Sequence, residues 1–86
     1  MAMKITFKLF ATLTDYLPAQ SRTSNIVELE VGRDASISEI IAPFGLPPKL
    51  VHLVLVNGKY VEPGDRLTHT LREGDVLAIW PPIAGG

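Results

Sequence analysis

The residues of this chain that are best suited to chemistry are its last two. The sequence ends on Pro81-Pro82-Ile83-Ala84-Gly85-Gly86. A terminal glycine offers the least hindered acyl carbon, and Gly85 lets the backbone enter a narrow channel without side-chain clashes. A terminal carboxylate is ionised at neutral pH and can attack a phosphate of ATP, which turns its oxygen into a leaving group. We therefore predict that Gly86 is the reactive residue and that residues 81–85 thread into a partner's channel.

Other side chains that could do chemistry lack partners at a suitable spacing. His52 and His69 have no acidic or cysteine neighbour at metal-ligand spacing, so we expect no metal site. Asp65 and Asp75 follow glycines in turns, where a carboxylate usually accepts bonds from nearby backbone. Ser36 fits the start of a helix better than a nucleophile, because no base is in view. The chain has no cysteine, which excludes disulfides and a thiol nucleophile.

The composition predicts one small globular domain. The 86 residues are 47% hydrophobic and 20% charged, which is typical of a folded chain rather than a disordered one. The formal net charge of −1 argues against nucleic acid or an anionic membrane as a partner. No signal peptide or membrane-spanning run is apparent, so we expect a cytoplasmic protein. We assign residues 1–80 to the domain and residues 81–86 to a flexible tail.

Alternating and continuous apolar runs indicate the strands that must position this tail. They fall at residues 3–9, 26–31, 50–56, 59–61 and 76–80. The run at 50–56 is nearly all apolar, which suits a strand that is covered on both faces or lies in the sheet centre, with His52 at an outward position. Asn57-Gly58 is a strong hairpin signal, since both turn positions need positive φ. Pro81 should end the pairing of the last strand.

The sequence indicates one main helix. Ser36-Ile37-Ser38-Glu39 has the form of a capping box, and the apolar residues that follow it have helical spacing. Pro43 and Gly45 limit this helix to about two turns. The connection at 11–25 is long. We expect a short helix before Pro18 and a surface excursion, a loop that runs over the surface, at residues 18–25.

This order of elements predicts an α+β, β-grasp (ubiquitin-like) fold. Two strands on each side of one helix imply a mixed sheet of about five strands with the helix on one face. We expect the first and last strands to lie side by side and parallel at the sheet centre.

Two surface features stay open at this point. Lys49, Lys59, Arg66 and Arg72 are either solvated loop charges, the reading we favour, or a rim for an acidic partner. Three aromatic residues fit an apolar docking patch and core packing about equally well, namely Phe10, Tyr60 and Trp80.

The tail resembles the aromatic-Pro-Pro-Val-Ala-Gly-Gly ending of the small subunits of molybdopterin synthase, in the ubiquitin-like sulfur-carrier (MoaD/ThiS) family. Three more stretches agree with that family and its thiamine branch, at residues 8–13, 55–61 and 71–76. The resemblance implies that an ATP-dependent, ubiquitin-activating-like enzyme adenylates Gly86, and that sulfur displaces AMP to leave a thiocarboxylate. It implies no bound cofactor and no turnover by the chain alone. It also implies a large synthase subunit as the second partner, in which the sulfur passes to a pterin precursor.

Pro81-Pro82 and the long first connection favour the molybdopterin branch. Ile83 replaces the usual Val, Trp80 stands where Phe is common, and residues 18–25 lack a glycine-rich turn. The alternatives are a sulfur carrier for thiamine thiazole or tRNA thiolation, a ubiquitin-like modifier that forms isopeptide bonds, and a non-catalytic β-grasp interaction module.

Overall fold

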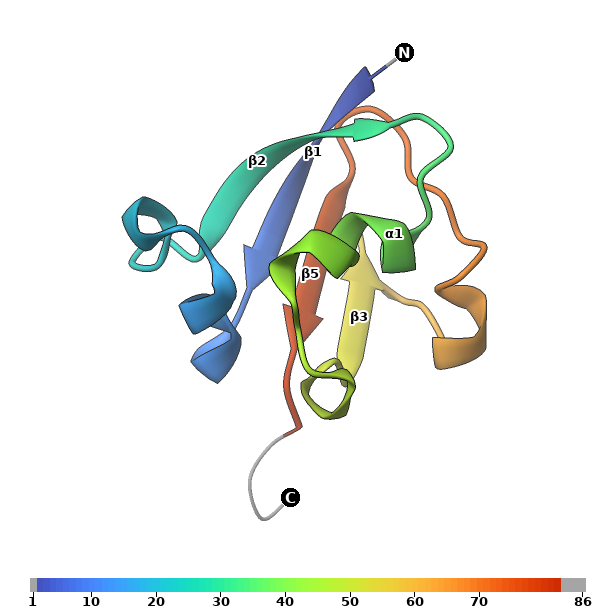
Figure 1. Cartoon of the computed structure of the whole chain (residues 1–86). Coiled ribbons are helices and arrows are strands. Elements are labelled where there is room, and N and C mark those ends of the chain that lie inside the picture. Colours follow the sequence, from blue (N-terminus) through green and yellow to red (C-terminus); the bar gives the residue numbers. More distant parts are fainter. Residues whose placement is uncertain (1, 83–86) are drawn as a thin grey trace.

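Five strands form one mixed sheet in the computed structural model, which describes residues 2–82 (Figure 1). The strands are β1 (Ala2–Leu9), β2 (Ile26–Gly32), β3 (Leu53–Val56), β4 (Lys59–Tyr60) and β5 (Val76–Trp80). Their order across the sheet is β2-β1-β5-β3-β4. β1 and β5 are parallel neighbours at the centre, and the other neighbouring pairs are antiparallel. The predicted β-grasp arrangement, with a parallel first and last strand, is confirmed.

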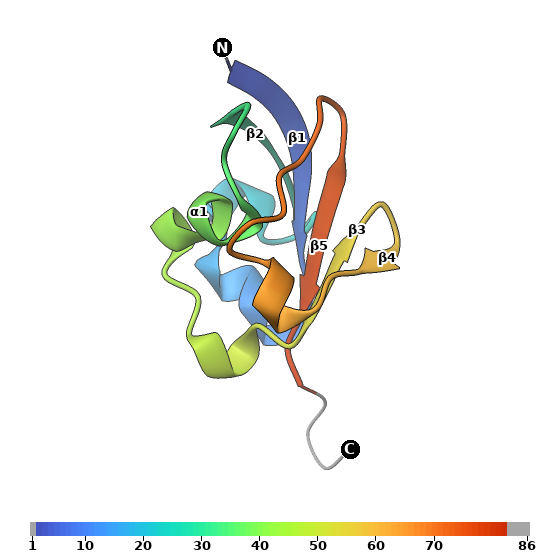
Figure 2. The same ribbon diagram turned by 90° about the vertical axis from the view of Figure 1, so that its right-hand side faces the viewer.

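One face of the sheet is covered by α1 (Ile37–Ile41), as the edge-on view in Figure 2 shows. The Ser36 hydroxyl accepts the Glu39 N–H at 3.2 Å, and the Glu39 carboxylate accepts the Ser36 N–H at 2.9 Å. The helix continues into a 3-10 turn, η3 (Ala42–Phe44), and ends at Gly45, whose φ is +67°. Both the capping box and the length of about two turns are therefore confirmed.

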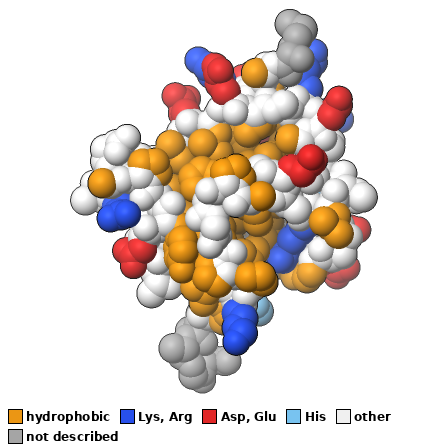
Figure 3. All heavy atoms as spheres, viewed as in Figure 1, with side chains coloured by type: hydrophobic (Ala, Val, Ile, Leu, Met, Phe, Trp, Pro, Cys, Tyr) orange, Lys and Arg blue, Asp and Glu red, His pale blue; other side chains and the backbone are white. Residues whose placement is uncertain are grey.

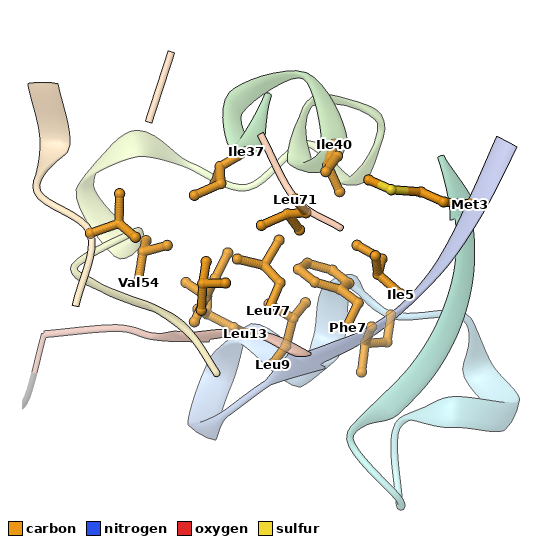
Figure 4. Packing of buried hydrophobic residues seen from close by; sticks show 14 residues of the cluster. Met3, Ile5, Phe7, Leu9, Leu13, Ile37, Ile40, Val54, Leu71 and Leu77 are labelled. Atoms are coloured by element: carbon orange, nitrogen blue, oxygen red, sulfur yellow. The ribbon is translucent and has the colours of Figure 1, made fainter. Parts of the chain in front are cut away.

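The hydrophobic core lies between α1 and the sheet. In β1 every second side chain is buried, and Phe7 is fully buried. Its ring lies 4.7 Å from that of Phe44, measured between centroids. Ile37 and Ile40 of α1 point toward Phe7 and Leu77 from the other side (Figure 4). This packing fixes the two central strands, and β5 leads to the tail.

The third strand is shorter than predicted. It begins at Leu53 rather than residue 50, because Pro48–Leu50 form a 3-10 turn, η4, that starts at a proline. His52 therefore precedes the strand, although it is exposed as expected. Leu53 and Leu55 are half-buried, so only the other face of β3 is covered by the core. Burial on both faces was therefore wrong, whereas the alternative of a strand inside the sheet fits, because β3 lies between β5 and β4.

The connections follow the sequence signals closely. The short helix before Pro18 is present as a 3-10 helix, η1 (Ala11–Tyr16), and a second turn, η2 (Ala19–Ser21), lies in the surface excursion. Asn57 and Gly58 both have positive φ, which confirms the hairpin turn. A further 3-10 turn, η5 (Pro63–Asp65), follows β4. None of the helices in residues 2–82 is long and apolar enough to cross a membrane.

Candidate functional site

The base of the tail lies at the end of the central strand β5. The Trp80 carbonyl accepts the His52 N–H at 3.2 Å, and the strand ends there because Pro81 has no N–H to donate. Pro81 is half-buried and Pro82 is exposed. Figures 1 and 2 both show the chain leaving the sheet beyond the end of β5. The predicted end of pairing at Pro81 is therefore confirmed.

Four of the predicted site residues lie outside the described residues. They are Ile83, Ala84, Gly85 and Gly86. The structure thus places the start of the predicted tail, Pro81 and Pro82, and the role of Gly86 stays a prediction from the sequence.

An apolar surface borders the base of the tail, on the face of the sheet opposite α1. Trp80 stacks on Phe10 with ring centroids 3.8 Å apart and an interplanar angle of 5°. Trp80 is paired with Leu53, and Tyr60 is paired with Leu55. Leu53 and Leu55 are two residues apart in β3, so all four side chains lie on the same face of the sheet. Four of the five are half-buried, and Tyr60 is 50% exposed. We call this surface the apolar platform; it consists of Phe10, Leu53, Leu55, Tyr60 and Trp80.

The structure argues against core packing of the three aromatic residues. Phe10, Tyr60 and Trp80 all lie outside the buried core cluster. They lie together with two leucines of β3 on the surface of the sheet, so core packing does not explain them, and a docking role stays a prediction. The chemistry available to the described residues here is binding and orientation.

Arg66 holds the segments around the tail base together. Its side chain is only 8% exposed, and its guanidinium donates to the carbonyls of Val61 at 3.1 Å, Val51 at 3.3 Å and His52 at 3.1 Å. Since the N–H of His52 bonds to Trp80, Arg66 fixes the residue that supports the end of β5. Sequence reasoning missed this role, because the three carbonyls belong to residues 5 to 15 positions away.

The predicted group of four basic residues is not one surface. Arg66 is buried, whereas Lys49, Lys59 and Arg72 are exposed. Lys49 lies in η4, at the same end of the sheet as Pro81, whereas Arg72 precedes the start of β5 at the other end (Figure 1). The three exposed residues fit both interpretations, so solvated loop charges stay the favoured prediction, and for Arg66 that prediction was wrong.

The other polar candidates have structural roles or lie apart. Asp75 accepts the Asn57 side-chain amide at 2.9 Å and the Arg72 N–H at 2.8 Å, so it joins the hairpin turn to the start of β5. Asp65 uses its main-chain carbonyl instead, which accepts the N–H of His69 at 2.8 Å. His52 and His69 are exposed in separate loops.

Comparison with known proteins places this fold in a family. A model of the Mut7-C ubiquitin family matches residues 2–84. No curated protein sequence matches the chain. The solution structure of the HVO 2177 protein of Haloferax volcanii is 24% identical, with a TM-score of 0.75 over 99% of this chain and 88% of that one.

Two further structures show the same fold. The crystal structure of SAMP1 from Haloferax volcanii is 24% identical, with a TM-score of 0.65 over 96% of this chain and 99% of that one. A chain of the complex of subunits 1 and 2 of the molybdopterin-converting factor from Helicobacter pylori is 18% identical, with a TM-score of 0.57 over 98% and 100% of the two chains. At the level of the fold, these similarities confirm the predicted ubiquitin-like resemblance to the small molybdopterin synthase subunits. Because the family model spans nearly the whole sequence, this chain belongs to the Mut7-C ubiquitin family.

Proposed function

We propose that this chain is a sulfur carrier whose own Gly86 carboxyl group carries the sulfur. The observation that carries the proposal is the course of β5, a central strand of a ubiquitin-like sheet that leads directly into Pro81-Pro82 and so toward Gly85-Gly86. The six residues 81–86 would reach about 20 Å when extended. That length is sufficient to enter the active site of a partner while the domain stays outside.

The chemistry requires a free carboxyl group on Gly86 and two steps on a partner enzyme. The carboxylate oxygen attacks the α-phosphorus of ATP, which forms an acyl adenylate and releases pyrophosphate. Hydrosulfide then attacks the acyl carbon, AMP leaves with the oxygen, and a thiocarboxylate remains after loss of one proton. This chain supplies an unhindered acyl carbon, and the adenylating enzyme supplies ATP and catalysis.

The apolar platform supports a docked partner. It lies beside Pro81, so an enzyme that binds it would receive the tail at a fixed distance from the contact. We propose that two partners use the chain in turn, the adenylating enzyme and then a large synthase subunit in which the sulfur passes to a molybdopterin precursor. The Helicobacter pylori complex of two molybdopterin-converting factor subunits supports a two-subunit arrangement. Transfer to a thiazole or to tRNA would use the same carrier chemistry.

Intact mass spectrometry tests the proposed function. The 86-residue chain is incubated with an adenylating enzyme of this class, ATP and sodium sulfide, and we expect the mass to rise by about 16 units as sulfur replaces one oxygen. The reaction without ATP is the control. An enzyme that thiocarboxylates its own carrier but leaves this chain unchanged would contradict the proposal. Isopeptide conjugates in a lysate that require Gly86 would instead show a protein modifier.

The platform should set how tightly the adenylating enzyme binds. We expect Tyr60→Ala to raise the carrier concentration needed for half-maximal thiocarboxylation about tenfold, because it removes an exposed aromatic contact from the patch. Leu67→Ala is the matched control, since Leu67 is 74% exposed and is not part of the platform. Equal effects of the two variants in a titration of carrier against enzyme would argue against docking on this face.

A further inference from the structure

One edge of the sheet is formed by β2, which pairs with β1 alone. The N–H of Leu9 donates to the carbonyl of Asn25, at 3.2 Å, and these residues continue the β1–β2 register. Bonded and non-bonded pairs alternate along an antiparallel ladder, so Val27, Leu29 and Val31 direct their peptide groups at β1. The hydrogen bond of Thr6 supports this alternation: its N–H points away from β2 and donates to the carbonyl of Asp75 on the β5 side of β1. The peptide groups of the intervening β2 residues therefore point outward.

The outward edge of β2 is closed at both ends and open in the middle. At one end the Ser24 hydroxyl bonds the N–H and the carbonyl of Ile26, at 3.5 and 3.3 Å. At the other end the carbonyl of Gly32 accepts the Ala35 N–H at 3.0 Å. Between them, the outward peptide groups of Glu28 and Glu30 have no hydrogen-bond partner within residues 2–82. Two residues with free donors and acceptors can pair with one short added strand.

An apolar groove runs beside this open edge, between β2 and the helix. Its volume is about 310 Å³, enough for one or two side chains. Figure 3 shows apolar side chains gathered across this face of the molecule, with charged side chains around them. The apolar lining consists of Leu29, Val31, Ala35, Ile40, Pro43 and Phe44. A strand added to β2 would place alternate side chains in this groove, because side chains alternate between the faces of a sheet.

The charges beside the edge select a basic occupant. Glu28 and Glu30 are exposed and alternate along β2 with the groove residues Leu29 and Val31, although Glu30 also borders the groove. Glu39 of α1 is exposed at the groove itself. An added strand would therefore meet carboxylates with one set of side chains and apolar groups with the other. The pairing of β2 with β1, on the other side of β2, already follows this pattern, because Lys4 is paired with Glu30. Opposite charges on paired strands are favourable.

We propose that the β2 edge and its groove bind an extended protein segment in which basic and apolar residues alternate. The segment adds a strand beside Glu28 and Glu30, with its apolar side chains between β2 and η3 and its basic side chains over the two carboxylates. A second copy of this chain does not fit, because antiparallel pairing of two β2 edges about Leu29 would set Glu28 against Glu30. The surface is separate from the apolar platform, which lies on the opposite face of the sheet and at its centre and far edge.

A peptide titration followed by NMR tests the proposed strand addition. The probe is a capped seven-residue peptide with lysine at odd and valine at even positions. We expect it to shift the amide signals of Glu28 and Glu30 and to slow their hydrogen exchange, while the Tyr60 amide on the far edge stays unchanged. The same peptide with glutamate for lysine should bind at least about tenfold more weakly. Equal binding of both peptides, shifts centred on β4, or dimerisation of the chain through β2 would overturn the proposal.

Variants separate the two parts of the recognition. Glu28→Gln with Glu30→Gln should weaken the lysine peptide about tenfold and leave a weak salt-independent remainder, whereas Glu62→Gln, far from β2, should have no effect. Glu28→Pro removes an outward N–H without touching a bond to β1, and should weaken binding by about tenfold or more. Thermal unfolding shows whether the proline variant is folded; if it is not, the glutamine pair decides. Unchanged affinity in the glutamine pair would refute the charge argument.

Discussion

Removing Gly86 is expected to abolish thiocarboxylate formation and to leave the free energy of unfolding unchanged. The buried core of residues 2–82 extends from Met3 to Ile79, so the truncation removes no residue of this core. The shortened chain still ends on a glycine carboxylate, that of Gly85, so the reacting group keeps its chemical identity. Its position changes by one residue, about 3.5 Å. A displacement of this size removes the alignment that an enzyme needs between carboxylate and phosphate.

The measurement is the mass shift with sulfide and ATP, together with a urea unfolding curve for each chain. Ile83→Val is the matched control, because it alters the same segment and keeps its length. We expect this variant to be thiocarboxylated at the rate of the unaltered chain. If the chain lacking Gly86 gained sulfur at a similar rate, reach would not matter and the proposed threading of the tail would be wrong.

Periodicity and turn chemistry were sufficient to predict most of this fold. The alternation in β1, the Ser36–Glu39 capping box and the Asn57-Gly58 turn each depend on a few neighbouring residues, and all three are present. The start of β3 was predicted three residues too early, because the apolar run begins at residue 50, where the 3-10 turn that starts at Pro48 still continues. A local sequence pattern does not show which apolar side chains stay exposed, because this depends on how the sheet and the helix pack together.

The candidate site was predicted only in part for the same reason. The end of β5 follows from one proline, and it is where the sequence indicated. The platform needs Phe10 from the first strand's end, two leucines of β3 and Tyr60 of β4, which come together only through the strand order. Arg66 and Arg72 look alike in the sequence, since each stands in a polar loop segment. Their difference arises from carbonyl groups of distant residues, which no spacing rule describes.

Replacing Arg66 by methionine is expected to lower the free energy of unfolding by about 3 kcal/mol. Methionine fills much of the same space, but it leaves the three carbonyl oxygens of Val51, His52 and Val61 without their charged donor. Arg66→Lys should cost roughly 1–2 kcal/mol, because an ammonium group cannot reach three carbonyls from one planar fork. Urea unfolding of each variant gives these values.

Arg72→Met is the matched control, because Arg72 is exposed and uses only its main-chain N–H in the bond to Asp75. We expect its free energy of unfolding to change by no more than about 0.5 kcal/mol. The Arg66 variants should also speed hydrogen exchange at the His52 amide, which bonds to Trp80 at the end of β5. Faster exchange there would link the buried guanidinium to the base of the tail. If the variants were less stable but exchange at His52 were unchanged, the effect of Arg66 would be limited to the loops around residues 51 and 61. The end of β5 would then depend only on the pairing of β5 with β1 and β3.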